Sequence, residues 1–207
     1  MSEIRYRLAK PSDAKEIANL HWSVRERYKE GIFLSMGKDF LASYYKLTLN
    51  DPWEVVVCAV NEEGRIVGFT ETTLDAKCKY KNVRSHKLYL GWIVLKALLR
   101  RPYLTKAVWQ RYHSLDENNK GPKFFNAEGV RGAFWCWSKS DDSLKSYEMI
   151  KVKNNILKAV GVKEYHFEVD KQNKAVYKFH LKVNKAEPVE EIELPDGRIR
   201  VVMRKQL

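Results

Sequence analysis

The most concentrated group of chemically active side chains in this chain is a run of basic residues that could bind an anion. Residues 76–113 hold ten lysines and arginines and no aspartate or glutamate. The whole chain of 207 residues has 38 basic and 26 acidic residues, for a formal net charge of +12, so ten of the twelve excess charges lie in this segment. Such a segment suits phosphate groups, an anionic membrane or an acidic protein, and its charge alone does not choose among them.

Other familiar chemistries are absent from the sequence pattern. The three cysteines, Cys58, Cys78 and Cys136, are odd in number and form no C-x-x-C pair, so neither a disulfide framework nor a zinc ribbon is indicated. Free thiols fit a reducing cytoplasm. No histidine and carboxylate cluster has metal-ligand spacing and no phosphate loop of the G-x-x-x-x-G-K type occurs, so no metal site is expected.

The sequence predicts the helices and strands of one α/β domain, and these elements must position any polar residues that carry chemistry. Apolar periodicity and turn residues predict strands, helices and a closing hairpin, with no internal repeat. A mixed sheet with helices on its faces follows from their order. The expected strands cover residues 4–8, 53–60, 65–74, 131–137, 164–169, 192–194 and 199–203, and the expected helices cover residues 11–28, 38–49, 144–160 and 173–183.

The basic segment itself predicts two helices, residues 87–100 and 103–113, separated at Pro102 and followed by a loop over residues 115–129. The simplest interpretation packs one face of the first helix, made of Leu88, Trp92, Leu95 and Leu99, on the sheet and leaves the lysines exposed. The apolar run 88–99 is shorter than a membrane span, and the first residues lack the apolar stretch of a signal peptide. The expected location is cytoplasmic, or peripheral on the inner face of a membrane.

Three stretches within this order resemble the GNAT superfamily of acyl-CoA-dependent N-acyltransferases: IRYRLAKPSDAKEIANLH, VVVCAVNEEGRIVGFT and VKEYHFEVDKQNKAVYKFH. The resemblance covers nearly the whole chain and implies one domain, residues 1–207, with a basic helical insertion at about 76–129. It also implies a mixed, mostly antiparallel central sheet flanked by helices. A longer stretch, GKDFLASYYKLTLNDPWEVVVCAVNEEGRIVGFTETTLD, is similar to acetyltransferases that modify amino sugars for surface polysaccharides.

The GNAT resemblance implies a donor site for acetyl-CoA. In this superfamily the fourth strand diverges from the fifth and its backbone pairs with the pantetheine arm, which here places Cys136, Trp137 and Ser138 beside the donor. The loop after that strand and the next helix N-terminus hold the pyrophosphate. The residues that correspond to the rest of this donor side are Ser143, Lys145, Ser146 and Asn173.

The expected pyrophosphate loop departs from the superfamily pattern. Residues 140–146 read SDDSLKS, without glycine and with Asp141 and Asp142 where the phosphates should dock. Glycine is used in such loops because the backbone must approach the phosphates closely. The pattern is therefore that of a degenerate pyrophosphate loop, which the nearby lysine and serine side chains compensate only in part.

The resemblance also indicates catalytic candidates. His180 occupies the position where the superfamily usually has a tyrosine that protonates the leaving thiolate, and Tyr177 lies one helical turn earlier. Glu71, with Glu54 as a second carboxylate, could act as a base on the acceptor amine. Each has a structural alternative: His180 as a core or surface histidine, and the glutamates as solvent-facing strand residues.

The leading functional hypothesis is an N-acyltransferase that moves acetyl from acetyl-CoA to the amine of a nucleotide-linked amino sugar or a similar small amine. One alternative is a degenerate GNAT-fold binding or assembly protein without CoA-dependent activity. Another keeps catalysis but takes its acyl group from an acyl carrier protein. The basic segment would meet a nucleotide diphosphate-sugar, an anionic membrane or the acidic carrier protein. No RNA-binding motif accompanies it, so nucleic acid is not an expected partner, and nothing indicates an oligomeric state.

Overall fold

The computed structural model describes residues 3–27, 32–113, 128–138, 143–193 and 197–207, although the side chains of residues 27, 111–113 and 143 are not described. These residues form a seven-stranded sheet in the order β1-β2-β3-β4-β5-β7-β6. The β4–β5 pair is parallel and the other neighbouring pairs are antiparallel, so the expected mixed, mostly antiparallel sheet is confirmed. The strands are β1 (Arg5–Leu8), β2 (Glu54–Val60), β3 (Ile66–Thr73), β4 (Arg131–Trp137), β5 (Glu164–Asp170), β6 (Glu187–Glu193) and β7 (Ile199–Gln206).

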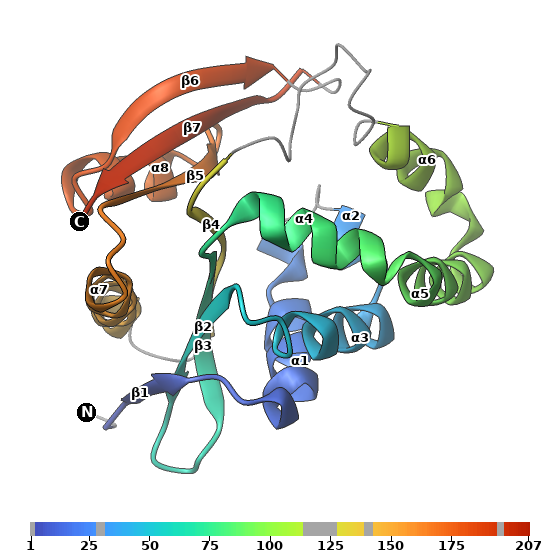
Figure 1. Cartoon of the computed structure of the whole chain (residues 1–207), viewed down its shortest axis with the longest axis horizontal. Helices are drawn as coiled ribbons and strands as arrows, with labels where there is room; N and C mark the ends of the chain where they lie inside the picture. The colour runs from blue at the N-terminus through green and yellow to red at the C-terminus, as the bar shows by residue number, and fades with distance from the viewer. Residues whose placement is uncertain (1–2, 28–31, 114–127, 139–142, 194–196) are drawn as a thin grey trace.

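Helices cover both faces of the sheet (Figure 1). On one face lie α1 (Ala14–Ser23), α2 (Ile32–Ser35) and α3 (Lys38–Thr48), whose apolar side chains join those of β2 and β3 in a first core. On the other face α7 (Ser143–Ala159) and α8 (Lys174–Lys182) form a second core with β5 and β7. Period-2 alternation in the strands supplies both cores, since successive side chains point to opposite faces.

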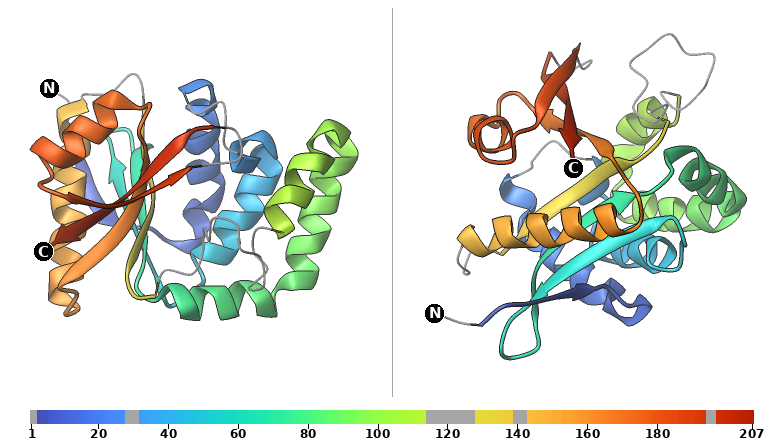
Figure 2. Two further views of the ribbon diagram at one scale, coloured as in Figure 1. Left: turned by 90° about the horizontal axis from the view of Figure 1, so that it is seen from above. Right: turned by 60° about the vertical axis from the view of Figure 1, so that its left-hand side comes forward.

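The described part of the segment between β3 and β4 is largely helical, and its longest helix packs beside α3. It contains α4 (Ala76–Ser85), α5 (Lys87–Arg100), a short 3-10 turn (Pro102–Leu104) and α6 (Thr105–His113). The two helices expected here correspond to α5 and α6, and Pro102 begins the turn that separates them. All three views in Figures 1 and 2 place α5 on the side of the molecule away from both chain ends.

Four expectations differ from the structure. The first helix ends at Ser23 and is followed by a 3-10 turn (Arg25–Arg27), so it does not reach Tyr28, which lies outside the described residues. The α4 helix was not expected, and β6 begins five residues before the predicted strand. Most of the predicted loop over residues 115–129 also lies outside the described residues.

The fourth difference concerns how α5 packs. The predicted packing face is exposed, with Leu88 84% and Leu99 75% accessible to solvent. The buried residues are instead Ile93 and Ala97, which join the first core. The helix has two apolar faces. Apolar periodicity identifies one of them correctly, but it does not predict which face packs against the first core.

Candidate functional site

The parallel strands β4 and β5 are paired at only one position, which leaves an opening in the middle of the sheet. Their register consists of Arg131↔His166 alone, with the backbone N–H of His166 donating to the Val130 carbonyl at 3.0 Å. On its other side β4 is paired with β3 along its full length, from Arg131↔Thr73 to Trp137↔Gly68. The chain therefore separates β4 from β5 after the first residues of β4.

The backbone of Trp135 faces this opening. The N–H of Ser138 donates to the Val67 carbonyl of β3 at 2.7 Å. Hydrogen-bonding groups alternate between the two edges of a strand, so Phe134, Cys136 and Ser138 direct theirs toward β3 while Trp135 directs its own toward β5. This is the edge at which an extended ligand could add to β4.

The predicted donor-side residues on β4 point to opposite faces of the sheet. Cys136 is buried in the first core, and Trp135 and Trp137 pack against the second. The Trp137 indole covers Gly68 so closely that any Cβ at Gly68 would overlap its six-membered ring. Cys136 is thus a packing residue, and burial next to apolar groups is typical of an inert structural thiol.

Aromatic rings from three elements meet beside the opening. Phe179 of α8 has its ring centroid 5.0 Å from that of Trp135 and 5.6 Å from that of Tyr147 on α7. The Trp135 Nε1 atom is buried and has no hydrogen-bond partner among the described residues. A buried N–H donor without an acceptor is costly, and it is the kind of group that a bound carbonyl oxygen would satisfy.

His180 lies in this aromatic group and is uncharged at neutral pH. Its ring centroid is 5.5 Å from that of Trp135 and 4.5 Å from that of Phe167 on β5, so it is next to both strands that border the opening. Burial, with a smaller effect of the Lys153 charge, lowers the pKa of His180 to about 3. The Asn184 amide nitrogen is 3.1 Å from Nδ1, so Nδ1 accepts that hydrogen bond and the proton is on Nε2. The ring can donate a hydrogen bond but does not carry the positive charge of a strong acid.

A buried lysine lies near His180, and sequence reasoning did not identify it. Lys153 of α7 is 3% exposed, and its Nζ donates to the Tyr165 hydroxyl at 2.6 Å. Burial, and to a smaller extent the Lys205 charge, lowers the pKa of Lys153 to about 7. Its spacing was a usable signal, because residues 149, 153 and 157 lie on one helical face and both neighbours, Met149 and Leu157, are core residues.

The structure places the other predicted donor-side residues at or near helix starts. The Asn173 side chain caps α8 by accepting from the Val176 N–H at 3.3 Å, and Tyr177 is half-buried against the second core. The predicted phosphate residues open α7: Ser143 begins it, Ser146 is buried, and Lys145 pairs with Glu148 at 3.2 Å. Asp141 and Asp142, like residues 139 and 140, lie outside the described residues.

Glu71 belongs to a second polar cluster, on the opposite face of β3. Lys79 of α4 places Nζ 2.8 Å from the Glu71 Oε1 atom and 2.7 Å from the Glu54 Oε1 atom. The Tyr44 hydroxyl donates to Glu71 Oε1 at 3.3 Å, and Thr73 Oγ1 donates to Glu54 Oε1 at 2.7 Å. Both carboxylates are buried, and neither Oε2 atom has a partner among the described residues. The two glutamates are therefore not solvent-facing strand residues.

The electrostatics of this cluster favour a charged lysine. Burial and the neighbouring Glu71 raise the pKa of Glu54 to about 7. Burial alone would lower the pKa of Lys79, but the two carboxylates outweigh it and raise that pKa well above its ordinary value. Glu71 is paired with Phe134 in the sheet, one residue from Trp135, so the carboxylate cluster and the β4–β5 opening lie close together but on different faces.

His21 on α1 is also a core residue. Its Nδ1 lies 2.6 Å from the Tyr45 hydroxyl, and its ring is in edge contact with Phe134 at a centroid distance of 4.9 Å. Burial lowers the pKa of His21 to about 4. The ring is neutral at physiological pH and contributes packing to the first core.

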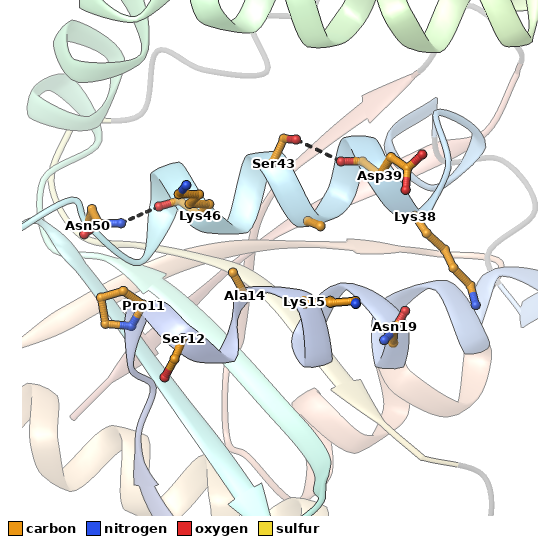
Figure 3. A pocket seen from close by; sticks show the side chains of 11 residues that line it. Pro11, Ser12, Ala14, Lys15, Asn19, Lys38, Asp39, Ser43, Lys46 and Asn50 are labelled. Carbon is orange, nitrogen blue, oxygen red and sulfur yellow. Dashed lines mark hydrogen bonds between the residues drawn. The ribbon is translucent and has the colours of Figure 1, made fainter.

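One surface groove lies elsewhere, between α1 and α3 (Figure 3). Its volume is about 660 Å³, and most of its lining residues are of polar types, with Lys15 and Asn19 on α1 facing Lys38, Ser43 and Lys46 on α3. None of the predicted site residues lines it. The groove therefore adds nothing to the chemistry at the β4–β5 opening.

The described residues contain neither a candidate metal site nor a candidate membrane-spanning helix. No three histidine, cysteine or carboxylate side chains in this part of the chain come together as a metal site. None of the described helices combines the length and apolar content that crossing a bilayer requires.

Comparison with known proteins identifies the fold. No family model matches the sequence, and no curated protein does. Among solved structures, an N-acetyltransferase from Staphylococcus aureus is similar at a TM-score of 0.59 and 12% identity, with 99% of each chain covered. A GNAT-family acetyltransferase from Streptococcus pneumoniae is similar at 0.55 and 13% identity, covering 99% of this chain and all of the other. Aminoglycoside 6′-acetyltransferase type Ii is similar at 0.56 and 11% identity, covering 98% of this chain and 96% of that one. The chain has the GNAT fold.

Proposed function

We propose that this chain is an N-acyltransferase that uses acetyl-CoA as donor and a small amine as acceptor. The observation that carries the proposal is the β4–β5 opening, which the backbone of Trp135 faces and beside which its indole N–H has no partner in the described part of the chain. An extended chain of amide groups that ends in a thioester could pair with the free backbone groups of this edge as an added strand would. The residues at the opening thus fit the pantetheine arm, whereas the expected pyrophosphate loop falls largely outside the described residues.

Bound acetyl-CoA would supply a thioester carbonyl that a neutral amine can attack. The C–N bond would form as the C–S bond breaks, and the proton that the amine loses would end on the departing sulfur, which leaves as the thiol of CoA. The Trp135 backbone would hold the arm as an added strand. The neutral His180 ring, through Nε2–H, and the Trp135 indole N–H are the donors available to the carbonyl oxygen or the departing sulfur. His180 would act as a hydrogen-bond donor in this scheme, since burial keeps it from holding a positive charge.

For the acceptor we propose an amino sugar joined to a nucleotide, the class indicated by the sequence resemblance. The basic side chains of residues 76–113 would meet its diphosphate. Glu71 is the carboxylate nearest the opening in sheet register, but its side chain is buried and its Oε1 atom is paired with Lys79. It would therefore act on the acceptor amine only through its charge and not by direct contact.

Isothermal titration with acetyl-CoA tests the donor assignment. We expect saturable binding, weakened about tenfold in Trp135→Phe because the variant keeps an aromatic ring but loses one buried hydrogen bond. Trp92→Phe is the matched control, since Trp92 lies on the exposed face of α5. Absence of binding at millimolar acetyl-CoA, or equal losses in the two variants, would refute the proposal.

A second candidate function is a GNAT-fold binding protein without a CoA donor. It is favoured by the Trp135, Tyr147 and Phe179 rings packed beside the opening and by the lack of glycine in residues 140–146. This candidate predicts that the same titration yields no heat at any acetyl-CoA concentration.

A further inference from the structure

The α5 helix has two apolar faces, and only one of them is covered by protein. Ile93 and Ala97 are buried in the first core, and Leu90 and Val94 pack partly against it. Leu88, Trp92, Leu95 and Leu99, here called the α5 stripe, have exposed fractions of 84%, 55%, 47% and 75%. At about 100° per residue, the centres of the two faces are about half a turn apart. The stripe therefore points directly away from the body of the protein.

Exposed large side chains are rarely gathered so closely on a soluble monomer. The stripe spans three helical turns without a break, and two further exposed aromatic residues, Tyr103 and Trp109, follow on the 3-10 turn and α6. A continuous exposed apolar row of this kind marks a surface that contacts another apolar phase. Leucine and tryptophan are the side chains expected where such a row enters a lipid interface.

The charges around the stripe are of one sign. Lys87 and Lys96, both exposed, flank it on either side of the helix, and the Lys96 ammonium lies 4.9 Å from the centroid of the Trp92 ring. Of the ten basic residues in 76–113, Lys79 and Arg100 are paired with carboxylates of the body. Because that segment has no acidic residue, the surroundings of the stripe would attract an anionic surface.

The stripe is also accessible to a broad surface. In all views α5 lies on the side of the molecule away from both chain ends, at the edge of the ribbon diagram (Figures 1 and 2). A single helix that projects its apolar row outward offers no groove for a peptide or a compact ligand. It can, however, lie flat on a planar surface with its basic flanks at headgroup level.

We infer that the α5 stripe docks the protein onto a bilayer that contains anionic lipids, with Leu88, Trp92, Leu95 and Leu99 in the boundary between headgroups and acyl chains. A second copy of the chain fits poorly, because pairing two stripes would bring two basic rims together. An acidic carrier protein would engage the lysines but would leave four large apolar side chains unexplained. The inference does not rest on the proposed acyl transfer.

Flotation with vesicles tests the docking. The full chain is mixed with vesicles of phosphatidylcholine alone or of equal parts phosphatidylcholine and phosphatidylglycerol, at low and high salt. We expect flotation with the anionic vesicles that weakens in high salt, and about a tenfold smaller partition coefficient for Leu95→Glu. Val189→Glu is the matched control, since Val189 is 54% exposed on β6, an edge strand that Figure 1 places on the opposite side of the molecule from α5.

Quenching by brominated lipids locates the contact. Tryptophan fluorescence of the wild-type chain should be quenched on anionic vesicles, and Trp92→Phe should lose much of that quenching while still floating. The inference is overturned if the wild type does not float or if Leu95→Glu floats like Val189→Glu. It is equally overturned if the wild-type chain does not bind vesicles but forms a dimer, or a complex with acyl carrier protein, that Leu95→Glu abolishes.

Discussion

At the scale of single residues, the interior holds three basic side chains that burial keeps from charging easily. The pKa values of His21, His180 and Lys153 are lowered to about 4, about 3 and about 7, in each case chiefly by burial. Each has a hydrogen-bonding neighbour, respectively Tyr45, Asn184 and Tyr165. These side chains therefore act mainly as hydrogen-bond donors and acceptors in the interior. His180 does so at the border of the β4–β5 opening.

The two histidines make stability depend on pH in a defined window. In the unfolded chain a histidine binds a proton below about pH 6.5, whereas His180 and His21 remain neutral in the folded chain down to much lower pH. The unfolded state thus binds more protons, so the free energy of unfolding decreases as the pH falls from about 6.5 toward 4. We expect a slope of about 1.4 kcal/mol per pH unit for each histidine. Urea unfolding at several pH values across this window measures it.

Substitution isolates one of the two contributions. His180→Gln keeps an acceptor for Asn184 and removes the titration, so its unfolding free energy should fall less steeply with acid than that of the wild type, by about 1.4 kcal/mol per pH unit. His86→Gln is the control, because it makes the same substitution at an exposed histidine beside α5. If the His180→Gln curve runs parallel to that of the wild type, His180 is not held neutral by the fold.

Sequence reasoning found where some of these residues lie but not what surrounds them. The superfamily pattern predicted His180 as a candidate on the helix after β5, and the structure places it beside Trp135 and Phe167. The pattern could not predict that the ring is neutral, since its pKa depends on burial by residues far apart in the chain. Lys153 was missed because a lysine within a helix is ordinarily exposed.

At the scale of secondary-structure elements, α4 is held by polar contacts and not by an apolar face. Asp75 caps it by accepting from the N–H groups of Lys77 and Cys78, and Lys79 joins it to β2 and β3 through Glu54 and Glu71. Its sequence, AKCKYKNVRS, is low in apolar content and has few large apolar side chains, which is why the helix was not predicted. The Asp75 cap was the available signal.

Removing the charge of Lys79 should therefore destabilise the protein strongly. Lys79→Met leaves Glu54 and Glu71 buried together without a counter-charge, which we expect to cost about 3–5 kcal/mol of unfolding free energy at neutral pH. Adding Glu71→Gln should recover part of that loss, because the remaining carboxyl group can take up a proton. Thermal and urea unfolding measure both. Lys81→Met, an exposed lysine of the same helix, should change stability by less than about 0.5 kcal/mol, and a comparable loss there would contradict this account.

The strands illustrate the same limit of sequence patterns. Buried strands such as β2 and β3, rich in valine and threonine, were predicted within a residue or two of their observed bounds. The edge strand β6 reads EPVEEIE and is largely exposed, so alternation was visible only near Ile192. Charged residues and a proline are typical of an edge strand that must not pair with another chain, and they conceal it from a search for apolar periodicity.

At the scale of the whole molecule, the sheet consists of two halves that share little backbone pairing. Strands β1 to β4 form one half and β5 to β7 the other, joined by one register position. Across the seam, Arg131 of β4 pairs with Glu168 of β5, which also accepts from Arg200 of β7 at 3.0 Å. The helix α7 connects β4 to β5 in sequence and packs on β2 and β3. The two halves are thus joined by ion pairs where β4 begins, and their backbones are not paired along the rest of β4.

This division predicts an alternating pattern of amide hydrogen exchange along β4. The inward N–H groups of Phe134 and Cys136 are bonded in the β3 ladder, whereas the N–H of Trp135 faces the unpaired side, so Trp135 should exchange at least about tenfold faster than its neighbours. If the opening receives an acyl donor as an added strand, acetyl-CoA should slow Trp135 selectively and leave Phe134 and Cys136 unchanged. Exchange followed by NMR resolves the three residues. Equal protection at all three without donor would mean that the two halves are paired beyond Arg131, and the opening on which the acyltransferase proposal depends would not exist.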